Sequence, residues 1–293
     1  NMSEDVWPFI SSISDKRMFA FEIEDNAHLG DRDIFAVSPN GEILCMLPLP
    51  ISEEYLSYYK SIMNVSTVRV TVPSKHTGEI CEDILRDEAV MDALVGAAGE
   101  GKSLTLISYT TSLQFLRLVR VLRERGIAVH TPESPEEEDA WVVNFFGSKS
   151  GIRQFAQKSG AVEPDLRMAD GMFCVGIDDA ARIAANKYVA RDGVVIKTNK
   201  GHSGSGVLIF RPGELPKEYR VCREKILEIL SKDVFWDRFP IVIEDYIACN
   251  PAVGGGFPNV EFKVQKGGKV EFLYYCGIFH SFGCFQFGQF RFF

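Results

Sequence analysis

Apolar and polar residues between positions 104 and 131 change their spacing twice. The runs Leu104–Tyr109 and Ile127–Thr131 each predict a strand. Between them, Thr111-Ser112 offers an N-cap and Gly126 marks the end of a helix. The apolar residues of that helix are spaced for one helical face: Leu113, Leu116, Val119 and Leu122. A strand, a helix and a strand within about thirty residues form a βαβ unit, so we expect a parallel, Rossmann-like α/β layer.

More elements of this layer are expected upstream. Ser66–Val72 is rich in β-branched residues and predicts a strand, whereas Gly78–Ala98 has helical spacing. Two strand-like runs, 33–38 and 42–47, flank Asn40-Gly41, which favours a hairpin turn. No glycine-rich fingerprint follows Leu104–Tyr109. The layer is therefore expected to have the shape of a dinucleotide-binding fold without its phosphate loop.

The second half of the chain predicts two helices and a strand. Residues 147–160 form the first helix, which Gly160 ends. Its apolar face contains Ile152, Phe155, Ala156 and Ser159, and its polar face contains Lys149, Arg153 and Gln157. The second helix runs from about Asp178 to Tyr188, and Gly193–Lys197 follows as a buried strand ending in lysine.

A glycine-rich loop lies between two β-branched runs, in the segment GVVIKTNKGHSGSGVLIF from 193 to 210. A Walker A loop leads from a strand into a helix, but here both flanks are strands, so we expect the tip of a hairpin. Glycine backbone N–H groups and the hydroxyls of Ser203 and Ser205 can still cradle phosphate, with Lys197 as the cation. The competing interpretation is a plain flexible hairpin.

The apolar segment Phe239–Ile247 predicts a strand that ends in the acids Glu244 and Asp245. A carboxylate there can accept from the exocyclic amine of adenine, while the backbone of the next residues reads the ring nitrogens. Solvated acids are the ordinary alternative at a strand end.

Composition limits the classes of function. The 293 residues correspond to about two domains. A net charge of −8 argues against a general nucleic-acid binder, although it leaves room for a few placed cations. There is no apolar run long enough for a membrane span, and seven scattered cysteines without a C-x-x-C pattern favour a reduced, cytoplasmic protein. The acidic, proline-containing stretch Pro132–Asp139 is the expected boundary.

Three segments in order carry a family resemblance: GSKSGIR at 147–153, KTNKGHSGSG at 197–206 and VIEDYI at 242–247. Together they resemble the ATP-grasp carboxylate–amine ligases, and the nearest resemblance is to the pheganomycin-type peptide ligases. The resemblance implies a Rossmann-like pre-ATP-grasp domain at 2–135 and an ATP-grasp domain at 140–293, in which two α+β subdomains clamp ATP. The expected fold class is accordingly α/β followed by α+β.

The resemblance also implies roles for individual residues. Lys149 and Lys197 would contact the α- and β-phosphates or adenine. The loop would close over the β- and γ-phosphates, and the strand end would hold adenine. The implied ATP-binding residues are Lys149, Lys197, His202, Ser203, Gly204, Ser205, Gly206, Glu244, Asp245, Tyr246 and Ile247.

The implied activity is an ATP- and Mg²⁺-dependent ligation. A carboxylate of an amino acid or peptide is activated as an acyl phosphate and joined to an amine, with release of ADP and phosphate. Catalysis by positioned cations and amides fits the absence of a visible nucleophile motif. Two alternatives are loading of an amino acid onto a carrier-protein thiol in natural-product biosynthesis and a non-catalytic nucleotide-binding module. A third is an oxidoreductase, against which the missing glycine fingerprint argues. A homodimer is left open.

The sequence departs from the family in its acids. Pro251 stands where a ribose-binding acid is usual, and no acid follows Glu271. Because the family's magnesium ligands come late, we expect them in residues outside this sequence. Glu261 and Glu271 are weak stand-ins, and Cys276, His280 and Cys284 lack the fourth ligand that zinc usually takes.

Overall fold

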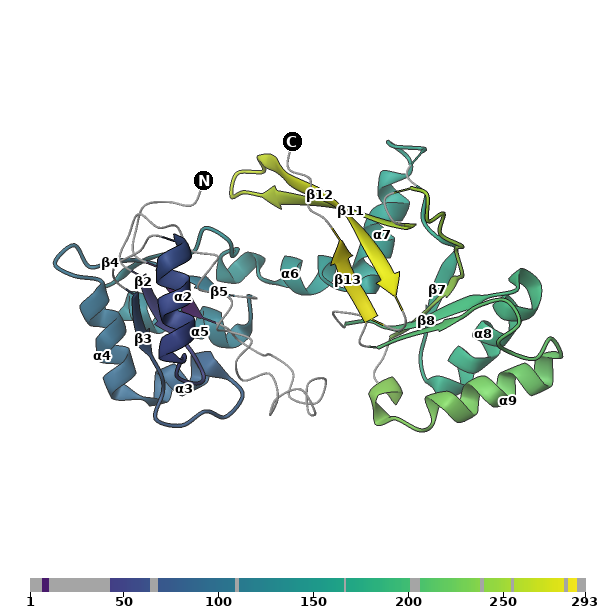
Figure 1. Ribbon diagram of the computed structural model, residues 1–293, viewed down its shortest axis with the longest axis horizontal. Coiled ribbons are helices and arrows are strands. Elements are labelled where there is room, and N and C mark those ends of the chain that lie inside the picture. The colour runs from purple at the N-terminus through teal and green to yellow at the C-terminus, as the bar shows by residue number, and fades with distance from the viewer. Residues whose placement is uncertain are drawn as a thin grey trace. The chain divides into compact units, whose positions relative to one another are not determined.

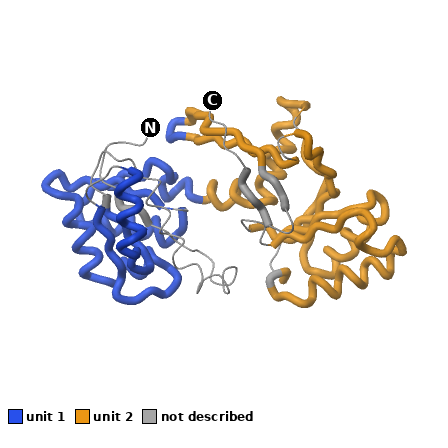
Figure 2. The backbone as a smooth tube through the Cα atoms, in the orientation of Figure 1, with its two compact units in different colours: residues 1–140, 265–267 blue, residues 141–264, 268–293 orange. Residues whose placement is uncertain are grey.

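The computed structural model describes residues 7–10, 43–63, 68–108, 111–165, 167–200, 206–237, 240–253, 256–281 and 284–288 (Figure 1). The expected hairpin at Asn40-Gly41 lies outside these residues. The chain divides into two compact units, one of residues 1–140 with 265–267, the other of residues 141–264 with 268–293 (Figure 2). Helices and several sheets occur together, so the mixed α/β class is confirmed.

The first unit is built on parallel strands. A four-stranded sheet has the order β3-β2-β1-β5, with β1 at Trp7–Ile10, β2 at Ile43–Met46, β3 at Val68–Thr71 and β5 at Ile107–Ser108. All its strand pairs are parallel. A second parallel pair joins β4 (Ser103–Thr105) to β6 (Ala128–His130), and α5 (Leu113–Glu124) connects them. The predicted βαβ unit is therefore confirmed.

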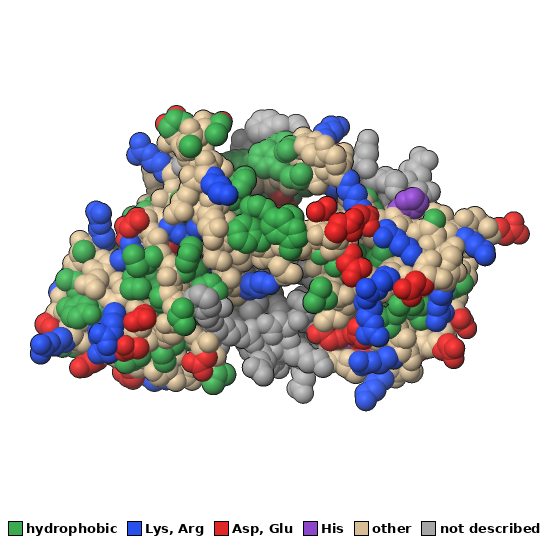
Figure 3. All heavy atoms as spheres, turned by 180° about the vertical axis from the view of Figure 1, so that it is seen from behind, with side chains coloured by type: hydrophobic (Ala, Val, Ile, Leu, Met, Phe, Trp, Pro, Cys, Tyr) green, Lys and Arg blue, Asp and Glu red, His purple; other side chains and the backbone are tan. Residues whose placement is uncertain are grey.

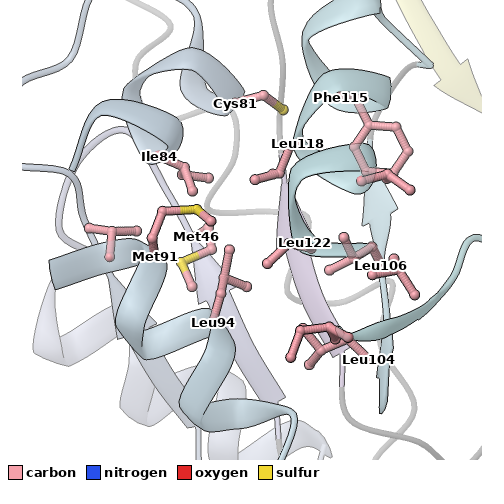
Figure 4. Close-up of a cluster of buried hydrophobic side chains, with 14 of the residues drawn as sticks. Met46, Cys81, Ile84, Met91, Leu94, Leu104, Leu106, Phe115, Leu118 and Leu122 are labelled. Atoms are coloured by element: carbon pink, nitrogen blue, oxygen red, sulfur yellow. The ribbon is translucent and has the colours of Figure 1, made fainter. Parts of the chain in front are cut away.

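Strand β2 shows how the sheet is covered on both faces. Leu44 and Met46 pack with α3 (Ile80–Arg86), α4 (Glu88–Ala97) and α5, whereas Cys45 packs with Tyr59 of α2 (Glu53–Met63). Figure 4 shows Met46, Met91 and Leu94 gathered opposite Leu122 in the larger of these two clusters. The alternation of side chains along a strand thus produces an α/β/α sandwich.

Local details differ from the predicted elements. The single helix expected at Gly78–Ala98 is two helices, because Asp87 is extended and its side chain caps Val90 N of α4. The strand expected at Leu104–Tyr109 is divided between two sheets at Leu106, whose N–H donates to the His130 carbonyl at 2.8 Å. Ser112 caps α5 as predicted, but Leu113 is 74% exposed and does not join the buried face.

The second unit contains an antiparallel sheet of order β7-β10-β8-β9. Its strands are β7 (Gly171–Cys174), β8 (Val194–Thr198), β9 (Val207–Phe210) and β10 (Ile241–Asp245). Helix α8 (Ile177–Arg191) packs against this sheet and α9 (Tyr219–Leu230) packs along α8 (Figure 1). Because β8 and β9 are antiparallel neighbours, the hairpin expected around the glycine-rich loop is confirmed.

Helix α7 (Lys149–Ser159) buries Arg153 of the face that was predicted to be polar, whereas Gln157 of that face is exposed. Arg153 is only 4% exposed, whereas Ile152 is 45% and Phe155 is 53% exposed. Phe155 lies against Phe146 of α6 (Trp141–Phe146), with ring centroids 5.5 Å apart. The apolar-face assignment for this helix was wrong: Arg153 is directed inward, where it has a carboxylate and two carbonyls as partners, and Ile152 and Phe155 are exposed.

The rest of the second unit includes an antiparallel sheet of β11 (Phe257–Val264), β12 (Val270–Ser281) and β13 (Cys284–Gly288). Among the cysteines whose side chains are described, five are buried and Cys249 is exposed, and all are free thiols. Acidic and basic side chains are interspersed over the face seen in Figure 3. None of the helices in the described ranges is long and apolar enough to cross a membrane.

Candidate functional site

The sheet of the second unit has one face that carries charge instead of a hydrophobic core. Val194 and Ile196 of β8 face α8 and α9, together with Ile241 and Ile243 of β10. Since side chains alternate along a strand, Lys197 and Glu244 point to the other face. Their strands are neighbours, with Val242 opposite Lys197 and Glu244 opposite Val195.

Arg153 joins this pair from α7. Its Nη1 donates to Glu244 Oε1 at 2.6 Å, and Lys197 forms an ion pair with the other oxygen, Oε2. The Arg153 Nη2 donates to the carbonyls of Ala169 and Gly171 at 3.0 and 3.1 Å. The Arg153 and Glu244 side chains are only 5% and 11% exposed. One carboxylate thus lies between two cations in a poorly solvated place.

The approach of Arg153 to Glu244 requires a glycine at 171. A Cβ there would lie 2.5 Å from the Ile243 carbonyl oxygen, 2.9 Å from Glu244 Cγ and 3.1 Å from Arg153 Cζ. The glycine leaves the space in which the guanidinium reaches both the carboxylate and the backbone carbonyls.

Lys149 adds a third cation. Burial lowers the pKa of its amine below the ordinary lysine value, the nearby charge of Lys197 lowers it further, and Glu244 acts in the opposite direction. Two cations therefore pair with one carboxylate and a third is close enough to interact with it electrostatically, which leaves an excess of two positive charges here in a chain of net charge −8. An excess of positive charge in a partly desolvated site favours an anion with several negative charges.

The first turn of α7 is attached to the segment that follows β8. Lys149 N donates to the Asn199 carbonyl and Ser150 N donates to Asn199 Oδ1, both at 2.9 Å. Gly151 N donates to the N-cap hydroxyl of Ser148 at 3.0 Å. These three N–H groups have partners within the protein, so the anion-attracting groups of the site are the side-chain cations and not the helix terminus.

The other expected ATP-binding residues are placed differently. Asp245 lies on the opposite face, where Lys187 of α8 donates to it at 2.7 Å and to Asp170 at 2.8 Å. Tyr246 packs against Gly193, and Ile247 is 60% exposed. Gly206, with φ +71°, accepts from Thr198 N at the base of the hairpin. His202, Ser203, Gly204 and Ser205 lie outside the described residues.

Arg153 is the site residue to which sequence analysis assigned no role. Its position one turn after Lys149, on the same helical face, was the available signal. Sequence analysis instead predicted that Arg153 lies on the polar face of α7, because Ile152 and Phe155 have the spacing of an apolar stripe that faces a core.

The described residues contain no group of three or more His, Cys, Asp or Glu side chains that could hold a metal ion. Glu261, considered as a stand-in, accepts a hydrogen bond from the Tyr274 hydroxyl, which raises the pKa of Tyr274 to about 12. The side chains of His280 and Cys284 lie outside the described residues. The acids that the structure describes form no such cluster, so no chemical step is assigned to a metal here.

Comparisons with known proteins give structural neighbours only. No family model matches the chain, and a search of curated proteins finds no match. Among solved structures, the chain is similar to D-alanyl-alanine synthetase A from Vibrio cholerae O1 biovar eltor str. N16961, with a TM-score of 0.44, 8% identity, and coverage of 95% of this chain and 68% of that one. It is also similar to D-alanine–D-alanine ligase from Bacillus anthracis, with a TM-score of 0.37, 12% identity, and coverage of 92% and 69%.

Proposed function

We propose that the protein is an ATP-dependent ligase that activates a carboxylate of an amino acid or peptide as an acyl phosphate and joins it to an amine, releasing ADP and phosphate. The observation that carries the proposal is the cluster of Lys149, Arg153 and Lys197 around Glu244, beside the β8–β9 hairpin. Two excess positive charges at this point fit a polyphosphate chain. The order of the three sequence segments supports the ATP-grasp class.

The same sheet face offers a surface for a planar base. Phe173 and Ile209 are 40% and 39% exposed, and they lie on the face of Lys197 because Phe173 pairs with Val242 and Ile209 with Val195. Glu244 is the acceptor for an exocyclic amine, and Lys149 and Lys197 are the donors for phosphate oxygens. The hairpin loop with His202, Ser203, Gly204, Ser205 and Gly206 and the backbone of Tyr246 and Ile247 complete the proposed site. Asp245 is left out because it faces α8.

In this proposal the protein positions its substrates and stabilises negative charge, and no side chain acts as a nucleophile. Lys149 and Lys197 would compensate the charge of the phosphates during transfer, which is the main contribution a protein makes to such a reaction. The bound nucleotide supplies the phosphoryl group. The partial desolvation of Lys149 makes its charge more effective than that of a fully solvated lysine.

The test is turnover of ATP with pools of amino acids and short peptides, with ADP, AMP, phosphate and pyrophosphate measured separately. Release of ADP and phosphate that depends on both a carboxylate and an amine supports the ligase. AMP and pyrophosphate would instead identify an adenylate-forming enzyme. ATP binding without any turnover would identify a nucleotide-binding module, and an acylated thiol product would identify carrier loading.

Two lysine variants make this test specific to the site. Lys197→Ala is expected to abolish turnover, because it removes the cation at the end of β8. Lys232→Ala is the matched control, since Lys232 is exposed and pairs with Glu228 of α9, on the far side of the sheet. Equal turnover by the two variants would contradict the assignment of the phosphate site.

A further inference from the structure

We infer that Arg153 is a positioning residue that fixes the orientation of Glu244 and thereby sets the preference of the site for a nucleoside triphosphate over a bare polyphosphate. The inference rests on the proposed function, because it assigns the part of the ligand that Glu244 recognises.

Three contacts define the orientation of the guanidinium. One terminal nitrogen donates to Glu244 Oε1, and the other donates to the carbonyls of Ala169 and Gly171. These contacts come from β10, the start of β7 and the segment before it, so the planar group is fixed by backbone as well as by the carboxylate. Arg153 therefore acts on Glu244 from a position that does not depend on Glu244 alone.

Glu244 has a second cation that competes for it. Lys197 pairs with Oε2 on a flexible stem, and Lys149 is close enough to interact electrostatically. Without Arg153, both carboxylate oxygens would be free to turn toward the lysines, and the orientation of the carboxylate would follow their flexible stems. With Arg153 present, one oxygen is committed and the carboxylate has a single orientation.

Arg153 is too buried to contact a ligand by itself. Its side chain is 5% exposed, against 11% for Glu244 and 28% for Lys197. The lysines and Glu244 are thus the groups that meet a ligand, and Arg153 acts through Glu244. This division separates two kinds of recognition, since lysines recognise phosphate and an oriented carboxylate recognises a base.

The experiment compares the Kd of ATP with the Kd of inorganic tripolyphosphate, measured by calorimetry on the full chain. The ratio of the two reports the contribution of the nucleoside. Arg153→Met is expected to lower this ATP preference on the order of tenfold, the effect of losing a hydrogen bond to a charged group. Arg153→Lys should also lower it, because an ammonium on a flexible stem does not reproduce the fork of three contacts.

Two controls separate positioning from a structural effect. Lys149→Met should weaken both ligands in parallel and leave the ratio unchanged. Lys187→Met removes a comparable cation–carboxylate link between α8 and β10 on the other face, so it should lower thermal stability and leave the ratio unchanged. Because Arg153 acts through Glu244, the double variant with Arg153→Met and Glu244→Gln should have the same ATP preference as the single variant Glu244→Gln.

The outcomes distinguish the two proposals. If the wild-type protein binds neither ligand, the proposed function fails. If it binds both and the Arg153 variants keep the wild-type ratio, only the role of Arg153 is overturned. If neither Arg153 variant folds, as judged by circular dichroism, the residue belongs to the framework of the unit and the inference is likewise overturned.

Discussion

Replacing Gly171 by alanine tests whether the charged face depends on a close approach of backbones. The new Cβ would lie 2.5 Å from the Ile243 carbonyl oxygen. An ordinary contact needs about 3.4 Å, so β7 and β10 would have to separate by about 0.9 Å at this point. The obstructing atom belongs to a strand backbone, which cannot turn away as a side chain can.

The expected loss in the free energy of unfolding is about 1–3 kcal/mol, the usual range for overpacking a filled site. Urea unfolding followed by circular dichroism measures it, with an unchanged m-value indicating that only stability has changed. Gly160→Ala is the matched control in the same unit, because its φ is −59° and its Cβ would meet nothing closer than 3.5 Å. That change should be neutral or stabilise by up to about 1 kcal/mol.

The same substitution should also reduce ATP affinity, because the Cβ would lie 2.9 Å from Glu244 Cγ and 3.1 Å from Arg153 Cζ. A Gly171→Ala protein as stable as wild type, within about 0.5 kcal/mol, would refute the argument. It would mean that the two strands accommodate a methyl group where the structure leaves no room for one.

Two further predictions concern single groups. Tyr188→Phe should lower the free energy of unfolding by about 1–3 kcal/mol in the urea assay, because the buried Leu215 N–H would lose the hydroxyl to which it donates at 2.8 Å. The control is Tyr275→Phe, at a 39% exposed position on β12, which should change the free energy of unfolding by less than about 0.5 kcal/mol. Burial lowers the pKa of Lys149, and phosphate binds the charged form, so the Kd of ATP should begin to rise at a pH below the ordinary lysine pKa of ~10.4. Lys149→Arg should remove that rise, and an identical pH profile of the Kd for both proteins would contradict the prediction.

The lowered pKa of Lys149 also has a defined effect on stability without ligand. Between the lowered folded-state pKa and ~10.4, the unfolded chain binds more protons than the folded one. The contribution of this group to the free energy of unfolding therefore increases as the pH rises through that window. Bound nucleotide should reduce this pH dependence of the free energy of unfolding, since a phosphate beside Lys149 would raise its pKa again.

Regular periodicity was sufficient to predict the secondary elements that form the framework of the site. The β8–β9 hairpin and the strand ending in Glu244 and Asp245 could be recognised because these strands are short, rich in β-branched residues and bounded by glycine or by acids. The parallel β4–α5–β6 unit followed from the cap at Ser112 and the change of period. In these segments local preference and tertiary packing agree.

The sequence could not predict which face of α7 is buried. Ile152 and Phe155 have core-like spacing, yet the helix turns Arg153 inward because a carboxylate and two carbonyls are available to it there. Those partners come from residues 16 to 91 positions away, so no local window contains them. Likewise, nothing in the sequence shows which of the two consecutive acids, Glu244 or Asp245, faces the site. The side-chain alternation of β10 in the structure assigns one acid to each face of the sheet.

The two consecutive acids of β10 have a consequence for how this strand is assembled. Glu244 requires the arginine of α7 on one side, and Asp245 requires Lys187 of α8 on the other. If the strand slipped by one residue, either Asp245 would take the place of Glu244 beside Arg153 or Glu244 would take the place of Asp245 beside Lys187, and in both cases the other acid would lose its partner. The two acids therefore favour the register that leaves the glutamate beside the lysines and the aspartate beside α8.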